Sequence, residues 1–552
     1  MAVIRNAVAT NEKTKKISKT GCSLILIAII IIQCAFILYQ GSTKKGYFFD
    51  EICSYGLSNS HNQPFLNSDN KMLNKWVDSS YFNDYLTVQD DEKFDFKSVY
   101  ANQVRDVHPP LYYFALNIVC SFFSNTISKW FGIALNILFF IVTQIFLFML
   151  ASKVFNKNLI LSFSTIILYG SSMLAIDNAV FIRMYMLLTM FAIISYYLHY
   201  CALISKKRLK YLPFIAVITY LGCLTQYYFL VLSFFIALTF CIILLFRKEI
   251  KNCLIYGMTM LLSIVAFYFT YPAVVEHLFG GGRVGNQTLE NAKSISGMIN
   301  RAVTFIISAF EGLTGHHTKK VALIVALILI ILFVIAFIKA DKQSLKKSLK
   351  NTLKNNLNNY SIIISVMLTF FVISLVAYGA FSRYIYFLYP VLTLLLVGFM
   401  YLCITNIFDN KKYIALVLAF SIMITGFTYI FSKSEHLYEQ VYDNQKIITE
   451  YSDCYGIIVC KSRTTLVAIQ EAMSLKQLKG VYTTSKENIR SVKKALRSKN
   501  TNNGIVVWID TNKFWSSDYD AKEIINNLKK ETGFKQSKEL YKYGVVEAYR
   551  VY

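Results

Sequence analysis

The stretch Arg105-Asp106-Val107-His108-Pro109-Pro110-Leu111-Tyr112-Tyr113, with Asp50-Glu51 about fifty-five residues before it, is the feature around which the chain is organised. Both pieces lie in the first long polar segment, residues 42–108. The acid pair directly follows Tyr47-Phe48-Phe49, and the longer stretch leads into the next apolar run. Ionisable groups at a membrane surface must be paired or hydrated. The pattern indicates a carboxylate centre at the bilayer edge; an ordinary polar loop with aromatic residues at headgroup level is the alternative.

The composition is that of a membrane protein. Of the 552 residues, 55% are apolar, and several apolar runs exceed the ~18 residues that cross a bilayer as a helix. Only six prolines occur, which favours long helices. The fold class predicted is a mainly α polytopic membrane protein with a small α/β C-terminal domain outside the membrane. A retained first span, residues 22–39, follows a basic N-terminus at residues 1–20.

About eleven transmembrane helices are predicted. The run at residues 111–123 is short for a span and begins after a double proline. If it crossed, the basic loops that follow would lie outside, against the positive-inside rule, so we expect it to lie in the interface. The spans after residues 22–39 are then 130–151, 158–174, 180–204, 211–224, 226–246, 253–271, 321–339, 360–378, 385–405 and 412–431.

The charge and cysteine patterns exclude two classes of function. The net charge of +25 is carried by short loops between apolar runs, whereas a nucleic-acid-binding protein would show a basic face on a soluble domain. Residues 42–108 hold ten carboxylates against seven Lys and Arg. No C-x-x-C pair occurs among the eleven cysteines, so a zinc or redox site has no support. Cys454 and Cys460 are the one pair considered for a disulfide.

Two domains are predicted. Residues 1–431 form the transmembrane domain, with outer loops at 42–108 and 272–320, and residues 432–552 form a soluble α/β domain. Strands are expected at 457–460, 480–483 and 504–509, helices at 468–475, 486–498 and 520–531, and one or two strands at 539–552.

The acid pair after the first span, followed by Asp-x-His-Pro-Pro-Leu-Tyr-Tyr, resembles the GT-C superfamily of membrane glycosyltransferases. The similarity is greatest to the glycosyltransferase 39 or PMT-2 group, which includes protein O-mannosyltransferases and aminoarabinose-lipid A transferases. It covers roughly the first 430 residues, most specifically the first 200. The resemblance implies transfer of a sugar from a polyprenyl-phosphate donor, with inversion and no covalent enzyme intermediate.

The resemblance also assigns roles. It implies that Asp50 is the general base and that Glu51 supports it; both could instead solvate a helix end. Asp106 and His108 could bind acceptor, orient the loop of Asp50 or hold a divalent ion, or Asp106 could cap a helix. Asp177 matches a second outer acid of the superfamily, or else pairs with Arg183.

Cations and tyrosines at the outer ends of spans are candidates for donor binding. Arg183, Arg283 and Arg383 suit phosphate, although an arginine at a span end can also snorkel to headgroups. Arg183 and Arg383, with Tyr185 and Tyr384 beside them, are the better placed. Gly280-x-Gly282-x-x-Gly285 has no strand before it, so it predicts a flexible outer loop and no dinucleotide site. His316-His317 in the same loop carries no assigned role, and metal dependence stays open.

The sequence thus predicts a glycosyltransferase of the cell membrane, with a cytoplasmic N-terminus and an extracytoplasmic C-terminal domain. Its partners would be a polyprenyl-phosphate sugar, a glycan, lipid or protein acceptor, and membrane lipid. The richness in Ile, Lys and Asn indicates a bacterial source. Two alternatives remain: a transporter or flippase of lipid-linked glycans, which would place ionisable groups mid-span in broken helices, and a non-catalytic anchor for the C-terminal domain.

Overall fold

A computed structural model describes residues 18–66, 71–280, 290–291, 293–315, 319–339, 357–408, 411–461, 466–512 and 519–552. Its contacts divide the chain into two compact units. We call Met1–Gln40, Val107–Leu111 and Asn136–Glu435 the membrane unit, and Gly41–Asp106, Tyr112–Leu135 and His436–Tyr552 the sheet unit. The first polar segment and the C-terminal segment thus belong to one compact unit; the predicted boundary at residue 432 stays a prediction.

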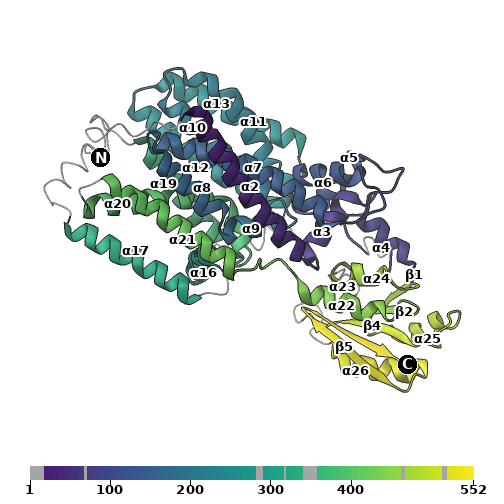
Figure 1. Cartoon of the computed structure of the whole chain (residues 1–552). Coiled ribbons are helices and arrows are strands. Elements are labelled where there is room, and N and C mark those ends of the chain that lie inside the picture. The colour runs from purple at the N-terminus through teal and green to yellow at the C-terminus, as the bar shows by residue number, and fades with distance from the viewer. Residues whose placement is uncertain are drawn as a thin grey trace. The chain divides into compact units, whose positions relative to one another are not determined.

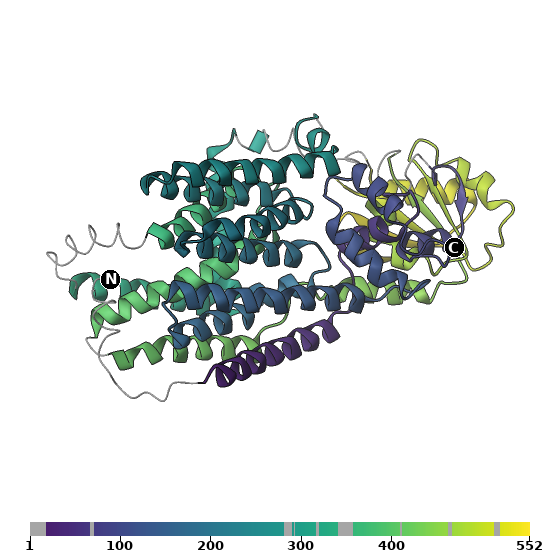
Figure 2. The ribbon, with the colours of Figure 1, turned by 90° about the horizontal axis from the view of Figure 1, so that it is seen from above.

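Long apolar helices run side by side through the membrane unit (Figures 1 and 2). Since the bilayer core offers no water, every backbone amide and carbonyl must be bonded within its own helix. In the described part of the chain, eight helices are long and apolar enough to cross a membrane: α2 (Lys19–Thr43), α7 (Lys129–Val154), α10 (Tyr185–Ile204), α12 (Tyr228–Phe246), α13 (Ile250–Thr270), α17 (Lys319–Lys339), α19 (Leu357–Val376), and η3 (Ser382–Leu388) continued by α20 (Tyr389–Ile407).

Every one of the eleven predicted spans contains a helix. Besides the eight, α8 (Leu159–Gly170) and α9 (Met173–Val180) form a pair bent by 50° that passes as one broken span. The two predicted spans not yet accounted for, 211–224 and 412–431, hold α11 (Leu212–Cys223) and α21 (Ala415–Phe431), which have 12 and 17 residues. The run after the double proline is α6 (Leu111–Ser121), an apolar helix of 11 residues and too short to be counted as a span.

Helices lie in a stretch that the sequence predicted to be an outer loop. Residues 272–320 were predicted as an outer loop, but α16 (Ile295–Thr314) and the short α14 (Val274–Phe279) lie within them. Arg301 of α16 is buried, and its guanidinium donates to the carbonyls of Ser374 (2.7 Å) and Leu375 (2.8 Å) at the end of α19. Helix ends leave such carbonyls without partners in the helix, so Arg301 caps α19 from a neighbouring element.

The sheet unit is built on a six-stranded sheet of order β1-β3-β2-β4-β6-β5. The bounds are β1 Trp76–Val77, β2 Tyr455–Val459, β3 Val481–Thr484, β4 Ile505–Asp510, β5 Ser537–Tyr543 and β6 Val546–Val551. Strands β3, β2 and β4 are parallel, with Ile457 opposite both Tyr482 and Val507. The last five strands lie where the sequence predicted them. The first comes from the polar segment after α2 and pairs antiparallel with β3, Trp76 opposite Tyr482.

The helices of this unit come from the C-terminal segment and from the polar segment. On one face, α25 (Ser491–Leu496) and α26 (Ala521–Thr532) pack on Ile457, Ile505 and Val507. The remaining helices of the C-terminal segment are α22 (Glu439–Thr449), α23 (Leu466–Gln470) and α24 (Ala472–Leu475). The polar segment forms α3 (Phe49–Asn59), α4 (Ser79–Leu86) and α5 (Phe96–Val104), and α23 packs against α3. The unit therefore joins segments that lie far apart in sequence.

The disulfide considered between Cys454 and Cys460 is not formed. Cys454 is a free thiol, and its Sγ lies 3.4 Å from the Asn503 carbonyl oxygen that it faces. Burial raises the pKa of Cys454 to about 11. The whole of β2 separates the two residues, and an extended strand of this length spans more than the roughly 7 Å that a disulfide tolerates between Cα atoms.

The sheet unit contains a buried carboxyl that is hydrogen-bonded to a residue of β5. Glu471, between α23 and α24, is 4% exposed. Its Oε2 accepts hydrogen bonds from the Tyr541 hydroxyl (2.7 Å) and the Ser474 hydroxyl (3.2 Å). The Trp508 indole donates in turn to the Tyr541 hydroxyl (2.8 Å). Burial raises the pKa of Glu471, and these hydrogen bonds oppose that shift.

This shift predicts a pH dependence. Because the folded carboxyl holds its proton more tightly than the unfolded one, the sheet is most stable below the ordinary Glu pKa of 4.5 and loses stability as pH rises above it. Glu471→Gln should remove this part of the slope. Amide hydrogen exchange of β4 in the full chain, corrected for intrinsic rates between about pH 4.5 and 8, measures it. Equal slopes in both proteins would contradict the assignment.

Candidate functional site

The acid pair lies in the first turn of α3, where negative charge complements the positive end of the helix dipole. Asp50 is half-buried, and its carbonyl accepts a hydrogen bond from the Ser54 hydroxyl (3.0 Å). Glu51 is fully buried. The two neighbouring residues therefore differ in burial: Glu51 is buried completely and Asp50 only in part.

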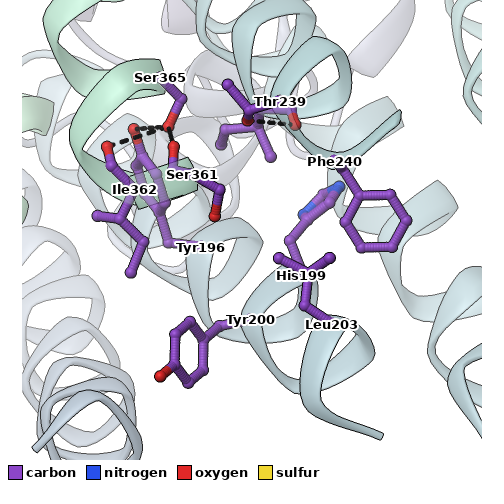
Figure 3. A pocket seen from close by; sticks show the side chains of 10 residues that line it. Tyr196, His199, Tyr200, Leu203, Thr239, Phe240, Ser361, Ile362 and Ser365 are labelled. Carbon is purple, nitrogen blue, oxygen red and sulfur yellow. Dashed lines mark hydrogen bonds between the residues drawn. The ribbon is translucent and has the colours of Figure 1, made fainter. Parts of the chain in front are cut away.

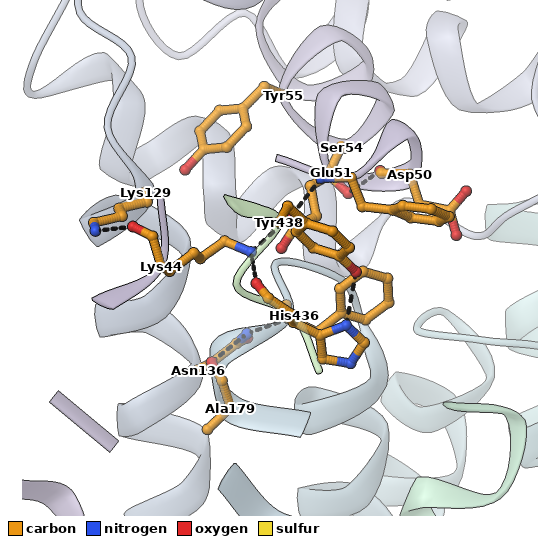
Figure 4. Close-up of polar contacts among 12 residues, drawn as sticks. Lys44, Asp50, Glu51, Ser54, Tyr55, Lys129, Asn136, Ala179, His436 and Tyr438 are labelled. Atoms are coloured by element: carbon orange, nitrogen blue, oxygen red, sulfur yellow. Dashed lines mark hydrogen bonds and ion pairs between the residues drawn. The ribbon is translucent and has the colours of Figure 1, made fainter. Parts of the chain in front are cut away.

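Glu51 is held by two donors on its Oε2 atom (Figure 4). The Phe48 amide donates at 2.8 Å, so Glu51 caps the N-terminus of its own helix as an N3 glutamate does in a capping box. The Lys44 ammonium lies at 2.9 Å, and both side chains of this ion pair are 0% exposed. Glu51 is therefore engaged in fixing the start of α3.

Lys44 connects α3 to the C-terminal segment. Its ammonium also donates to the His436 carbonyl (2.6 Å) and lies 4.6 Å from the centre of the Tyr438 ring. Burial lowers the pKa of Lys44, while the Glu51 carboxylate opposes the shift. A buried charge is tolerated only when it is paired and hydrogen-bonded. The Lys44 ammonium has a carboxylate partner, a carbonyl acceptor and an aromatic ring around it. The segment at residues 436–438 thus helps to hold the helix that carries Asp50.

Asp106 lies at the end of α5. Its amide donates to the Gln103 carbonyl (3.1 Å), and its side chain is half-buried. Burial raises the pKa of Tyr85, and the charge of Asp106 adds to this shift. The backbone of Asp106 closes α5, whereas α6 begins only at Leu111. Asp50, Glu51 and Asp106 all belong to the sheet unit.

His108 and Arg183 meet in the membrane unit. The His108 Nε2 lies 3.4 Å from Nη2 of Arg183, which is 4% exposed at the junction of α9 and α10. The His108 carbonyl accepts a hydrogen bond from the Tyr271 hydroxyl (3.2 Å). Arg183 lies in the short connection between the two helices, since α9 ends at Val180 and α10 starts at Tyr185. A histidine from the sequence motif and a buried arginine thus lie together at a break between helices.

Asp177 is 1% exposed on α9. Its Oδ1 accepts a hydrogen bond from the Glu435 amide (3.2 Å). The Glu435 Oε1 accepts in turn from the Tyr386 hydroxyl (2.9 Å) and the Ser382 hydroxyl (3.2 Å) of η3. Glu435, four residues after the end of α21, therefore links α9 to η3.

An aromatic group surrounds the second arginine. The Arg383 guanidinium lies 4.3 Å from the Phe381 ring centre and 6.0 Å from that of Phe181, both within cation–π range. Tyr185 stacks on Phe181 (centroids 6.1 Å apart, planes at 8°) and meets Tyr386 edge-on. Tyr384 meets Tyr228 edge-on at 5.7 Å.

The six predicted substrate-binding residues thus fall in one unit: His108, Asp177, Arg183, Tyr185, Arg383 and Tyr384. Phe181 and Tyr386 link Asp177, Tyr185 and Arg383 through the contacts above. The sequence reasoning missed Tyr271, Tyr386 and Glu435. The aromatic run around Tyr386 is a usable signal, since it directly follows Arg383, whereas Glu435 carries none beyond its position after the last apolar run.

Other candidates add no site. Arg283 and His316-His317 fall outside the described residues. Among the described residues, no group of three or more His, Cys, Asp or Glu could hold a metal ion. A cavity of about 10 Å³ lies between α10, α12 and α19 (Figure 3), at the lower limit for one water molecule. His199 lines it, with Nδ1 2.8 Å from the Ser195 carbonyl and Nε2 2.9 Å from the Tyr256 hydroxyl, so both ring nitrogens are bonded within the protein.

The buried ion pair yields a stability prediction. Glu51→Gln leaves the Lys44 ammonium buried without its counter-charge, which should lower the free energy of unfolding by roughly 3–5 kcal/mol. Lys44→Met combined with Glu51→Gln should cost less than the sum of the two single changes, because no charge is left buried. Melting temperatures of the detergent-solubilised chain measure this. Additive effects would show that the two groups do not act as a pair.

Comparisons with known proteins show similarity in part of the sequence and in the fold. Residues 107–271 match the family model PMT_2, dolichyl-phosphate-mannose-protein mannosyltransferase. That range includes His108, Asp177, Arg183 and Tyr185. Among curated protein sequences, none matches significantly.

Solved structures of ArnT from Cupriavidus metallidurans share the fold. The complex with undecaprenyl phosphate matches with a TM-score of 0.53 at 9% identity, and the apo state with 0.52 at 9%. Each match covers 96% of this chain and 98% of ArnT. The chain is thereby recognised as a polytopic membrane protein with the GT-C fold, similar over residues 107–271 to the dolichyl-phosphate-mannose-protein mannosyltransferases.

Proposed function

We propose that this protein is a membrane glycosyltransferase that takes a sugar from a polyprenyl-phosphate carrier and passes it to an acceptor hydroxyl. The observation that carries the proposal is the pairing of His108 with the buried Arg183, because both lie in the region that matches the mannosyltransferase family. The description of that family names a dolichyl-phosphate sugar, and the ArnT structure holds undecaprenyl phosphate. Both carriers combine a polyprenyl chain with a phosphate.

The arginines are suited to the leaving group. Negative charge develops on the carrier phosphate as the glycosidic bond breaks, and a fixed cation in a site of low dielectric stabilises it. Arginine presents a planar fork of donors that matches phosphate oxygens. In our proposal Arg183 and Arg383 bind this phosphate, while Tyr185 and Tyr384 line its approach. His108 and Asp177 orient the donor.

Asp50 is proposed as the general base. The acceptor hydroxyl must lose a proton as the new bond forms, and a carboxylate within hydrogen-bond distance can accept it. Glu51 is 0% exposed and bound to Lys44 and Phe48, so it is poorly placed to reach a substrate. The half-buried Asp50 beside it is supported as the residue that acts. Asp106 would bind acceptor or a divalent ion, and the reaction would invert the anomeric carbon.

The proposed setting is the outer face of a bacterial cell membrane. Under the positive-inside rule the basic loops after α7, α10 and α12 face the cytoplasm, as does the N-terminus. The carboxylates, Arg183 and Arg383 then lie on the outer side, together with the C-terminal domain. The acceptor would be a glycan, a lipid or a protein exposed there.

One observation favours a second candidate, a transporter or flippase of lipid-linked glycans. The bent pair α8–α9 carries the buried Asp177, and transporters build sites from broken helices with ionisable residues. The two functions are separated by an assay in detergent, where no compartments exist. Sugar transfer to an acceptor under those conditions supports the enzyme, since a transporter has no activity to show there.

The first prediction from this proposal concerns Asp50. Asp50→Asn keeps the shape of the side chain but removes its proton affinity, so turnover should fall roughly a hundredfold or more. Donor binding should persist. The assay uses purified protein in detergent with a panel of polyprenyl-phosphate sugars, measuring binding and transfer separately. Glu51→Gln, normalised to folded protein, should be milder, and Asp106→Asn should be severe only if Asp106 binds acceptor or metal. Near-normal transfer by folded Asp50→Asn would refute this base.

The second prediction concerns the phosphate. Arg383→Ala should weaken donor use by roughly 1.5–3 kcal/mol if the charge-assisted contact is desolvated. Lys320→Ala is the matched control, because Lys320 is an exposed cation at the start of α17. The donor concentration needed for half-maximal rate should rise only in the first variant. The same dependence on donor in both variants would remove Arg383 from the site.

A further inference from the structure

Two basic loops of the membrane unit form one surface. The first is residues 205–211, which follow α10 and contain η2 (Arg208–Tyr211). The second is residues 247–251, which follow α12 and include the first two residues of α13. Arg208 Nη2 lies 2.8 Å from the Glu249 Oε1, and Arg247 Nη1 donates to the Leu203 carbonyl at the end of α10 (2.7 Å). These bonds hold the two loops side by side.

The arginines and the acid of this surface are used internally. Arg247 Nη2 donates to Asn358 Oδ1 (2.7 Å), and the second oxygen of Glu249 accepts from the Asn252 amide (2.7 Å). Glu249 is the one acidic residue in the two loops. Five exposed lysines remain, which we call the basic collar: Lys206, Lys207, Lys210, Lys248 and Lys251.

Exposed apolar side chains alternate with the collar lysines. Leu209 is 45% exposed, Phe246 75% and Ile250 61%. Each of the three is followed directly by a lysine or an arginine in the sequence. A soluble phosphate or a nucleic acid would have no use for these apolar groups. A phospholipid does, since its acyl chains meet apolar side chains while its headgroup meets the lysines. Leu209 and Ile250 thus mark the level at which headgroups begin.

We propose that the basic collar binds the headgroups of anionic phospholipids, such as phosphatidylglycerol, and so anchors the α10–α13 end of the membrane unit. The five ammonium groups supply the counter-charge for lipid phosphates. The Arg208–Glu249 and Arg247–Asn358 contacts hold the loops that present them. This binding is independent of the sugar transfer proposed above.

Native mass spectrometry of the full chain in detergent tests the proposal, with phosphatidylglycerol and phosphatidylcholine of the same acyl chains as probes. Lys206, Lys207, Lys210, Lys248 and Lys251 are changed together to Gln. The control changes five exposed lysines of the sheet unit to Gln: Lys493, Lys494, Lys522, Lys530 and Lys535. Phosphatidylglycerol retention should fall at least about tenfold in the collar variant and stay unchanged in the control variant. In the unchanged protein, phosphatidylglycerol retention should decrease as the salt concentration rises.

Three outcomes would overturn the proposal. The first is equal phosphatidylglycerol retention by the collar and control variants. The second is displacement of the lipid by free glycerol phosphate at the same concentration, which would identify a phosphate site. The third is preference for a short oligonucleotide. Matching melting temperatures in phosphatidylcholine establish that the variants fold. If the fivefold variant does not fold, a triple variant replaces it, in which Lys207, Lys210 and Lys248 are changed to Gln. Its phosphatidylglycerol retention should fall less, because two collar lysines remain.

Discussion

The absence of water in the bilayer core constrains the whole membrane unit. Each backbone polar group there must be bonded within a helix. Irregular backbone that can present side chains to a ligand is therefore confined to places where a helix ends or bends. The candidate donor-binding residues follow this rule. His108 precedes α6, Arg183 lies between α9 and α10, and Arg383 lies in η3, each next to a helix end. The bend between α8 and α9 brings Asp177 into the same group of elements.

The acid pair shows how one helix start can serve two purposes. Glu51 faces Lys44 and the Phe48 amide, and these contacts fix the first turn of α3. Asp50, the residue before it, is carried on that turn but remains half-buried. Adjacent helical residues project about a hundred degrees apart, so a rigid structural carboxylate and an accessible one can be neighbours in sequence. A single Asp-Glu pair thereby combines a buried, bonded carboxylate with a partly exposed one, as the proposed division between support and catalysis requires.

Local patterns predicted the helices and most of the sheet, because apolar runs and short β-branched stretches report burial directly. Such runs mark the eight helices long enough to span, the bent pair α8–α9 and the last five strands. Partners distant in sequence could not be predicted. Nothing near Trp76 announces a strand that pairs with Tyr482, and α16 was missed because Arg301 and polar residues interrupt its apolar pattern. Within the candidate site, the motif indicated His108 and the position at a span end indicated Arg183, but neither gave a sign that His436 would hold Lys44.

The placement of cations explains why a chain with a net charge of +25 need not bind nucleic acid. Two buried cations meet fixed acceptors: Lys44 meets Glu51 and a carbonyl, and Arg301 meets the end of α19. Desolvation makes such positions expensive, so they occur only where geometry supplies the partners. The exposed lysines of the basic collar instead stand beside Leu209 and Ile250. Charge of one sign thus divides into cations that hold the fold and cations that face a lipid surface.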